Sequence, residues 1–390
     1  MNLNRYTVLD LETTIKAPIP HFGAAPLWPS NKVVLLGYKH EGSSEIKTIG
    51  REHDAKFIRE VSSEHRMLVG HNIPFDLLYL MRRGLHLANH TLWDTQKFFY
   101  IQRGRSPYST SLEEVAHFYG VPFKKDVEIK ERFKVGIGSD EIDEELLREY
   151  LIDDVETTEK IFLKQKEFCQ GQCKYFERYM TAMMNSLIPT TQMTFNGIYF
   201  NSASAKAEMK EKESQLDSLT TEFIQRWTRD LPVKEFNASS PVQIGRRLWG
   251  SDLVGELSET VTEVLDEVYK SGARKGQNKT RQTAKKYFVK GLVSESTIKI
   301  FQKNKWKTDG SAQTIKRLKK HDAGEVAESF VADLESLRHL TKEISTYYKP
   351  YINYSISDIL HPSFNHCVTA TGRLSSSKPN FQNINGKKDL

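Results

Sequence analysis

The first 170 residues alternate between short apolar runs rich in β-branched residues and segments with helical spacing. The apolar runs predict strands and the spaced segments predict helices. The predicted strands lie at residues 5–11, 32–39, 66–70 and 92–94, and the predicted helices at residues 55–63, 75–83, 111–119 and 143–168. Strands that alternate with helices in this way indicate an α/β domain over about residues 1–170.

The pattern changes after residue 170. Long segments with helical spacing follow at residues 172–187, 202–229 and 323–348, and they predict a mainly helical second domain. The stretch over about residues 255–307 is less regular, because Gly, Asn and Thr are scattered among its basic residues. No element is predicted for that stretch.

The composition is that of an ordinary globular protein. The chain has 390 residues, of which 38% are hydrophobic, and its mean hydropathy is −0.54, so a disordered or collagen-like chain is excluded. No apolar run approaches the roughly 20 residues of a membrane-spanning helix. The first ten residues lack the apolar stretch and cleavage site of a signal peptide, so we expect a cytoplasmic protein.

Positive charge is concentrated in the second half of the chain. Residues 1–170 carry 23 Lys and Arg against 26 Asp and Glu, while residues 270–320 alone carry 16 basic residues and only two acidic ones. Such a cluster suits the phosphate backbone of duplex DNA, and the candidate contacts are Lys279, Arg281, Lys285 and Lys286. A solvated, partly flexible insertion explains the same charges equally well.

Three elements of the first domain carry acids in suggestive places. Asp10 and Glu12 close the first predicted strand and point to one side of it, because strand side chains repeat every second residue. Asp76 lies in the first turn of a predicted helix, and Tyr150 and Asp154 share one face of the long helix. Taken singly, these features are also typical of a solvated surface, a helix cap and a surface pair.

In this order, the three elements resemble the DEDD 3′–5′ exonucleases, in the subclass that carries a tyrosine. The resemblance implies an RNase H-like mixed sheet and cleavage of DNA from its 3′ end. It implies that four carboxylates (Asp10, Glu12, Asp76 and Asp154) hold two Mg²⁺ or Mn²⁺ ions and that Tyr150 orients the attacking water. Asn72 is a candidate contact to the DNA strand. Two divalent cations would also relieve the repulsion among four clustered carboxylates.

A second resemblance lies near the C-terminus. Residues 369–385 read T-A-T-G-R-L-S-S-S-K-P-N-F-Q-N-I-N and resemble the signature that family A DNA polymerases carry at the start of the palm. Residues 193–201, 236–244 and 337–348 fall where that family has the segments around and inside its thumb. The resemblance covers nearly the whole chain except about residues 251–307. The DNA contacts that it implies are Thr371, Arg373, Ser375, Ser376, Asn380 and Gln382.

The later polymerase motifs of that family are absent, including its Asp-bearing palm strand and its Lys-bearing fingers helix. We therefore expect a second polypeptide to supply the rest of the palm and the fingers, as in a split, phage-type polymerase. The predicted organisation is an exonuclease domain at 1–170, a helical thumb-like domain at 171–355 with a basic insertion at about 251–307, and a palm fragment at 356–390. The predicted function is metal-dependent proofreading on DNA ends and primer–template duplexes. The alternatives are a free-standing exonuclease, a non-catalytic DNA-gripping subunit, and a sequence cut from a longer chain.

Overall fold

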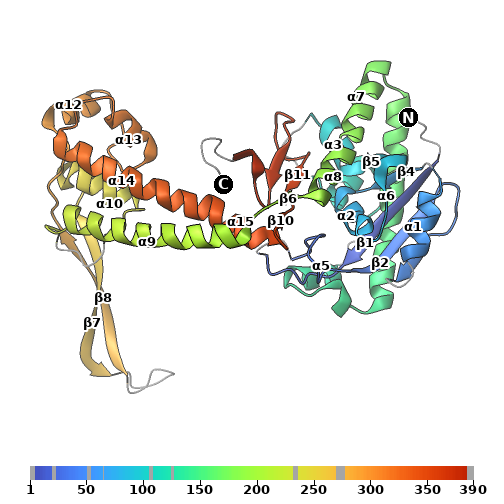
Figure 1. Cartoon of the computed structure of the whole chain (residues 1–390), viewed down its shortest axis with the longest axis horizontal. Coiled ribbons are helices and arrows are strands. Elements are labelled where there is room, and N and C mark those ends of the chain that lie inside the picture. The colour runs from blue at the N-terminus through green and yellow to red at the C-terminus, as the bar shows by residue number, and fades with distance from the viewer. Residues whose placement is uncertain are drawn as a thin grey trace. The chain divides into compact units, whose positions relative to one another are not determined.

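The computed structural model describes residues 5–19, 23–50, 54–64, 66–104, 109–123, 127–231, 236–268 and 277–383. The chain forms two compact units (Figure 1). The first unit joins Met1–Ala203 to Pro350–Leu390, and the second unit is the intervening Ser204–Lys349. These limits differ from the predicted domain limits near residues 170 and 355. In the described part of the chain, no helix has both the length and the apolar character needed to cross a membrane.

The first unit is built on a five-stranded mixed sheet with the order β3-β2-β1-β4-β5. Its strands are β1 (Tyr6–Thr13), β2 (Val33–His40), β3 (Lys47–Gly50), β4 (Met67–Gly70) and β5 (Thr91–Asp94). β2 runs antiparallel to β1 and β3, whereas β4 is parallel to β1 and β5. The predicted α/β architecture is confirmed. β3 was not predicted because it is short and lacks a buried face.

Eight α-helices accompany this sheet among the described residues before Ile198. They are α1 (Asp54–Ser62), α2 (Pro74–Met81), α3 (Thr95–Gln102), α4 (Leu112–Tyr119), α5 (Val127–Lys134), α6 (Glu144–Gln170), α7 (Lys174–Asn185) and α8 (Leu187–Asn196). Phe176 of α7 packs edge-on against Phe98 of α3 and Phe168 of α6. Such packing explains why α7 belongs to this unit rather than to the predicted second domain.

The long helix α6 approaches the sheet closely where β2 has a glycine. Asp143 caps α6, since its carboxylate accepts hydrogen bonds from the backbone of Glu145 and Leu146 at 3.1 Å each. A Cβ atom on Gly37 would lie 2.8 Å from Leu151 Cγ and 3.0 Å from Val155 Cγ2. Gly37 pairs with Asp10 across the strands. The missing side chain therefore lets α6, which carries Tyr150 and Asp154, lie close to β1.

We expect Gly37→Ala to destabilise the protein by about 1–3 kcal/mol, because the added methyl group overpacks a rigid interface. Thermal denaturation measures this effect. Gly50→Ala on β3 is the matched control, since nothing lies within 4 Å of the added Cβ there. Equal melting temperatures for the two variants would contradict the close approach of α6 to β2.

The C-terminal residues complete the first unit. Helix α15 (Lys349–Tyr354) leads into β9 (Ser355–Ile356) and β10 (Ile359–Leu360), and β10 pairs with both β9 and β6 (Ile198–Tyr199). β11 (Ser363–Asn365) then pairs with β12 (Ser375–Ser377). The hydroxyl of Thr194 in α8 donates to the Pro362 carbonyl at 2.8 Å, which fixes this segment to α8.

The second unit is mainly helical, as predicted. Its helices are α9 (Ser202–Trp227), α10 (Pro241–Trp249), α11 (Ser251–Val254), α12 (Glu295–Lys303), α13 (Ala312–Leu318) and α14 (Glu325–Glu343). Phe223, Trp249, Phe301 and Phe330 are buried in its core. The irregular stretch of the sequence forms a long hairpin of β7 (Leu257–Val268) and β8 (Asn278–Tyr287), which extends away from the helices of this unit (Figure 1).

Candidate active site

The four predicted metal-site acids come from three elements of the first unit. Asp10 and Glu12 lie on β1, Asp76 in the first turn of α2, and Asp154 on α6. Asp76 and Glu12 are buried, at 3% and 7% exposed. Burying acids without partners is costly, so this placement needs a physical reason.

Burial and mutual repulsion raise the pKa values of these acids. Burial raises the pKa of Asp10 to about 7 and that of Asp154 to about 8, and Asp10 raises the pKa of Asp154 further. Burial and the nearby Asp10 charge also hold the pKa values of Glu12 and Asp76 well above their usual range. A backbone hydrogen bond from Leu11 lowers the pKa of Asp10 and of Asp76, so one amide serves both carboxyls.

Carboxylate oxygens are the ligands that Mg²⁺ and Mn²⁺ prefer, so the donor set suits these ions. As they stand, however, no three His, Cys, Asp or Glu side chains among the described residues converge closely enough to hold a metal ion. Repulsion between charges acts over longer distances than a coordination bond of about 2.1 Å. The acids are thus grouped without forming a closed ligand set among the described residues.

Tyr150 is directed at one of these acids. A hydrogen bond links its phenol to the Asp154 carboxyl, one helical turn along α6. Burial first, and then the charges of Asp154, Glu12 and Asp10, raise the pKa of Tyr150 above its ordinary value. The phenol therefore keeps its proton and can donate it in a hydrogen bond.

Ser139 is a site residue that the sequence did not reveal. Its hydroxyl donates to Glu12 Oε2 at 3.0 Å, and Ser139 is only 2% exposed. This bond fixes the orientation of the Glu12 carboxylate. A lone serine 127 positions away from its partner gives no sequence signal.

Asp94 caps α3. Its Oδ1 accepts the backbone N–H groups of Gln96 at 2.9 Å and Lys97 at 3.2 Å. It also accepts the backbone N–H of Asn72 at 3.1 Å. Burial raises the pKa of Asp94 to about 6, and its charge contributes to the raised pKa of Asp76. Asn72 is held by this bond in a left-handed conformation with φ of 60°.

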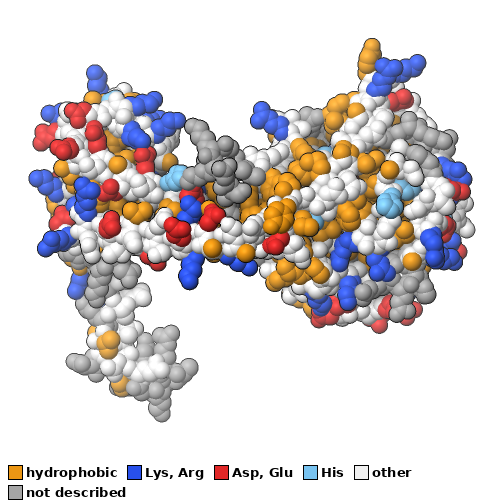
Figure 2. Space-filling model, viewed as in Figure 1, with side chains coloured by type: hydrophobic (Ala, Val, Ile, Leu, Met, Phe, Trp, Pro, Cys, Tyr) orange, Lys and Arg blue, Asp and Glu red, His pale blue; other side chains and the backbone are white. Residues whose placement is uncertain are grey.

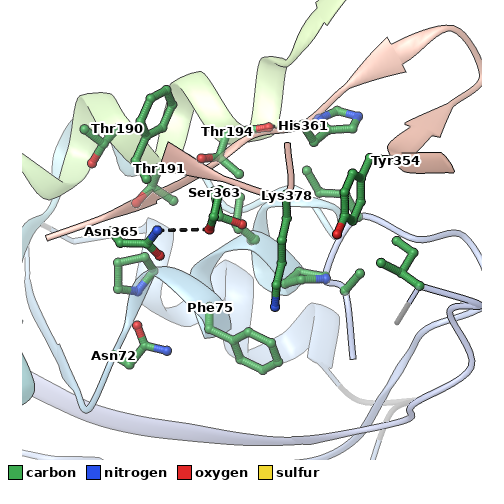
Figure 3. A pocket seen from close by; sticks show the side chains of 18 of the residues that line it. Asn72, Phe75, Thr190, Thr191, Thr194, Tyr354, His361, Ser363, Asn365 and Lys378 are labelled. Carbon is green, nitrogen blue, oxygen red and sulfur yellow. Dashed lines mark hydrogen bonds between the residues drawn. The ribbon is translucent and has the colours of Figure 1, made fainter. Parts of the chain in front are cut away.

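A cavity of about 190 Å³ opens beside Asn72 and Phe75. Figure 3 shows α8 residues, including Thr191, on another wall, with the Lys378 side chain extending toward Phe75. Asn365 also lines the cavity and donates to Ser377 Oγ at 3.0 Å. Thr191 is 2% exposed, and its hydroxyl has no hydrogen-bond partner among the described residues. An apolar wall with a few convergent polar groups is typical of a ligand site.

The predicted DNA contacts of the C-terminal segment divide into two groups. Thr371, Arg373, Asn380 and Gln382 are exposed, and Ser375 is half-buried on β12. Ser376, by contrast, is 5% exposed, and its hydroxyl bonds the Pro379 carbonyl and the Phe381 amide at 3.3 Å each. Ser376 therefore stabilises the turn after β12 and does not face the solvent. The last signature residues, Ile384 and Asn385, lie outside the described residues.

The predicted basic contacts of the insertion lie on β8, opposite an acidic strand. The register of the hairpin pairs Lys285 with Glu259 and Arg281 with Glu263, and Lys279 Nζ lies 2.8 Å from Glu267 Oε2. Asp266 is a fourth acid on β7. These acids lie before the basic stretch at residues 270–320, so the two strands together carry less positive charge than that stretch. Figure 2 likewise shows both charge signs on the helical part of the second unit.

Comparison with protein-family models gives a match for the C-terminal part of the chain. Residues 251–390 match the family model described as DNA polymerase family A. This segment is therefore similar to DNA polymerase family A. The match begins at Ser251 and so includes the stretch that sequence reasoning left unmatched to the family A thumb. No curated protein sequence matches the chain.

A solved structure shows a similar fold. The polymerase domain of Pol1 from M. smegmatis, in complex with DNA primer-template and dNTP, superposes with a TM-score of 0.60 at 17% identity. The match covers 99% of this chain and 53% of that one, so the chain spans about half the length of this polymerase. The likeness extends over both compact units, the carboxylate-bearing sheet included.

Proposed function

We propose that the chain is a metal-dependent 3′–5′ exonuclease of the RNase H-like DEDD type, joined to the DNA-binding part of a family A polymerase. The grouping of Asp10, Glu12, Asp76 and Asp154 is the observation that carries the proposal. Three separate elements bring these acids together at a cost in repulsion that bound cations would remove. Asp10, Glu12, Asp76 and Asp154 would hold two Mg²⁺ or Mn²⁺ ions.

When bound, two such ions lower the pKa of an attacking water and stabilise the leaving 3′ oxygen. The protein's own side chains orient the reacting groups. Tyr150 keeps its proton and would hold the water in line with the scissile phosphate, while Ser139 keeps the Glu12 carboxylate turned inward.

The cavity beside Asn72 is the proposed place for the substrate strand. Phe75 offers a ring on which a base can stack, and Asn72 and the unpartnered Thr191 hydroxyl can meet polar groups of the nucleotide. The Lys378 ammonium would attract a phosphate. Because α2 carries both Phe75 and Asp76, a strand held here would end close to the acids.

Polymerisation is proposed only together with a second polypeptide. The match to about half of the Pol1 domain and the family A segment support a role within such a polymerase on a primer–template. The short strand β6 exposes Ile198 and Tyr199, at 57% and 73%, which suits contact with further protein. Figure 2 shows hydrophobic side chains gathered on one face of the first unit.

Digestion of a 5′-labelled single strand and of a mismatched primer–template tests the proposal. We expect a ladder that shortens from the 3′ end in Mg²⁺, and no ladder in EDTA or with Asp10→Ala/Glu12→Ala. DNA binding without cleavage in Mg²⁺ or Mn²⁺ would favour the non-catalytic DNA-gripping subunit. Full cleavage without any added protein, and no change when a polymerase partner is supplied, would favour the free-standing exonuclease.

The hairpin yields a separate prediction. Four phosphate contacts through β8 would contribute about 3.6 to the slope of log K against log salt. We expect the joint change of Lys279, Arg281, Lys285 and Lys286 to Gln to alter that slope by less than about one, because Lys279 already pairs with Glu267 and the sequence of the paired strand β7 is acidic. Lys299→Gln/Lys303→Gln on α12 is the control. A decrease of three or more in that slope would instead show that the hairpin contacts duplex DNA directly.

A further inference from the structure

Lys97 is a buried lysine outside the carboxylate group. It lies on α3 and is 2% exposed. Its ammonium donates to the Met183 carbonyl, to Ser186 Oγ at 2.9 Å and to His366 Nδ1 at 3.0 Å. These three acceptors use all three of its protons, and all three are uncharged groups.

His366 connects Lys97 to α8 through a second hydrogen bond. Burial and the Lys97 charge lower the pKa of His366 to about 4, so its ring is neutral. Since Nδ1 accepts from Lys97, the ring proton is on Nε2, which donates to Thr190 Oγ1 at 2.9 Å. Lys97 and His366 thereby tie together α3, the α7–α8 junction and the segment that follows β11.

The same segment leads to the turn that carries Arg373. The Tyr100 hydroxyl donates to the Thr369 carbonyl, which also accepts the Gly372 amide at 2.8 Å. Thr369 Oγ1 donates to the Arg373 carbonyl at 2.6 Å. At the other end, Asp94 accepts the backbone N–H of Lys97 and acts electrostatically on Asp76. The network therefore spans from the exposed turn to the carboxylate group.

A buried ammonium is a costly way to fill this space. Removing a charge from water costs several kcal/mol, and an apolar side chain of similar length would pack there at a lower cost. What the charge provides, and an apolar side chain cannot, is a set of directional bonds from α3 to two other segments, the α7–α8 junction and the segment that follows β11. The gain is a fixed position for the segment from His366 to Arg373.

We infer that Lys97 is a positioning residue, which with His366 fixes the Thr369–Arg373 turn so that a strand end leaving a duplex there reaches the carboxylates. The inference rests on the proposed exonuclease function and deepens it. It predicts a difference between substrates. A strand end that must leave a duplex depends on the turn, whereas a short single strand reaches the acids without it.

Three variants test this role. We expect Lys97→Met and His366→Leu to slow cleavage of a duplex with a frayed 3′ end about tenfold, through kcat, because a charge-assisted hydrogen bond is lost. Cleavage of a short single strand should change less than about twofold. His366→Gln should restore most of the activity, since its amide offers an acceptor to Lys97 and a donor to Thr190. Equal losses on both substrates, or no rescue by Gln, would overturn the positioning role.

Hydrogen exchange of the backbone gives a readout that needs no nuclease activity. We expect Lys97→Met and His366→Leu to speed exchange in the peptide covering residues 363–373, whereas His366→Gln should not. Unchanged exchange in all three variants would refute the positioning role by itself. Failure of the wild-type protein to cleave either substrate, with exchange as expected, would refute the proposed exonuclease and leave the anchoring of the turn established.

Discussion

Asp76→Asn should abolish exonuclease activity and at the same time raise the melting temperature of the metal-free protein. The loss of activity should be at least about a hundredfold, because even partners of metal ligands are worth 10–100-fold. The gain in stability follows from burial, since a neutral amide in this place avoids both desolvation of a charge and repulsion from Asp10. Single-turnover cleavage and thermal denaturation at pH 8 in EDTA measure the two effects.

Asp153→Asn is the matched control for this variant. Asp153 is the neighbour of Asp154 on α6 and is not among the four grouped acids, although its charge contributes slightly to the raised pKa of Asp154. We expect the Asp153→Asn variant to keep nearly full exonuclease activity. A fall in both activity and stability for Asp76→Asn would mean that the Asp76 carboxylate serves the fold instead of the chemistry.

The second large effect is a loss of stability with rising pH when metal is absent. The folded-state pKa values of Asp10, Asp94 and Asp154 are about 7, 6 and 8, above the ordinary value of 3.8 for a carboxyl in the unfolded chain. An acid whose pKa is raised on folding binds its proton more tightly in the folded state. Its contribution to stability is therefore complete below about pH 4 and is lost as the pH rises through 6 to 8.

We expect the melting temperature in EDTA to fall by at least about 3 °C between pH 5 and pH 8. Added Mg²⁺ or Mn²⁺ should reverse most of the fall at pH 8, because cations that bind only the folded protein stabilise it. Ca²⁺ serves as a further probe of the same acids. A melting temperature that stays level or rises over this range would contradict the raised pKa values, and a metal response retained in Asp10→Ala/Glu12→Ala would place the cation elsewhere.

Local patterns predicted much of the fold. Alternation of short apolar runs with helical spacing located β1, β2, β4 and α6, because these elements bury a face that the sequence must mark. β7 and β8 carry no such mark, since β8 is polar and largely exposed and the apolar residues of β7 do not alternate regularly with polar ones. The pairing of acidic β7 with basic β8 depends on contacts between distant residues, so a charge count over one window missed it.

The candidate acids could be named from the sequence, because each sits at a strand end or at a regular helical spacing. The residues that orient their surroundings could not. Ser139 and Lys97 are single residues whose partners lie far away along the chain, at Glu12 and His366. Their importance arises from burial, which only the folded structure reveals. Ser376 is the opposite case. The sequence signature suggested a DNA contact at this position, but the Ser376 hydroxyl forms hydrogen bonds within the protein.

The first unit is built from two separate stretches of the sequence, so the two units can fold at different times during synthesis. Ser204–Lys349 is continuous in sequence and can fold as soon as it leaves the ribosome, whereas the first unit must wait for residues 350–390. Until His366 arrives, the ammonium of Lys97 lacks one of its acceptors. Anchoring of the first unit is thereby delayed until residues 350–390 have been synthesised, so a nascent chain that stalls earlier would lack an anchored first unit.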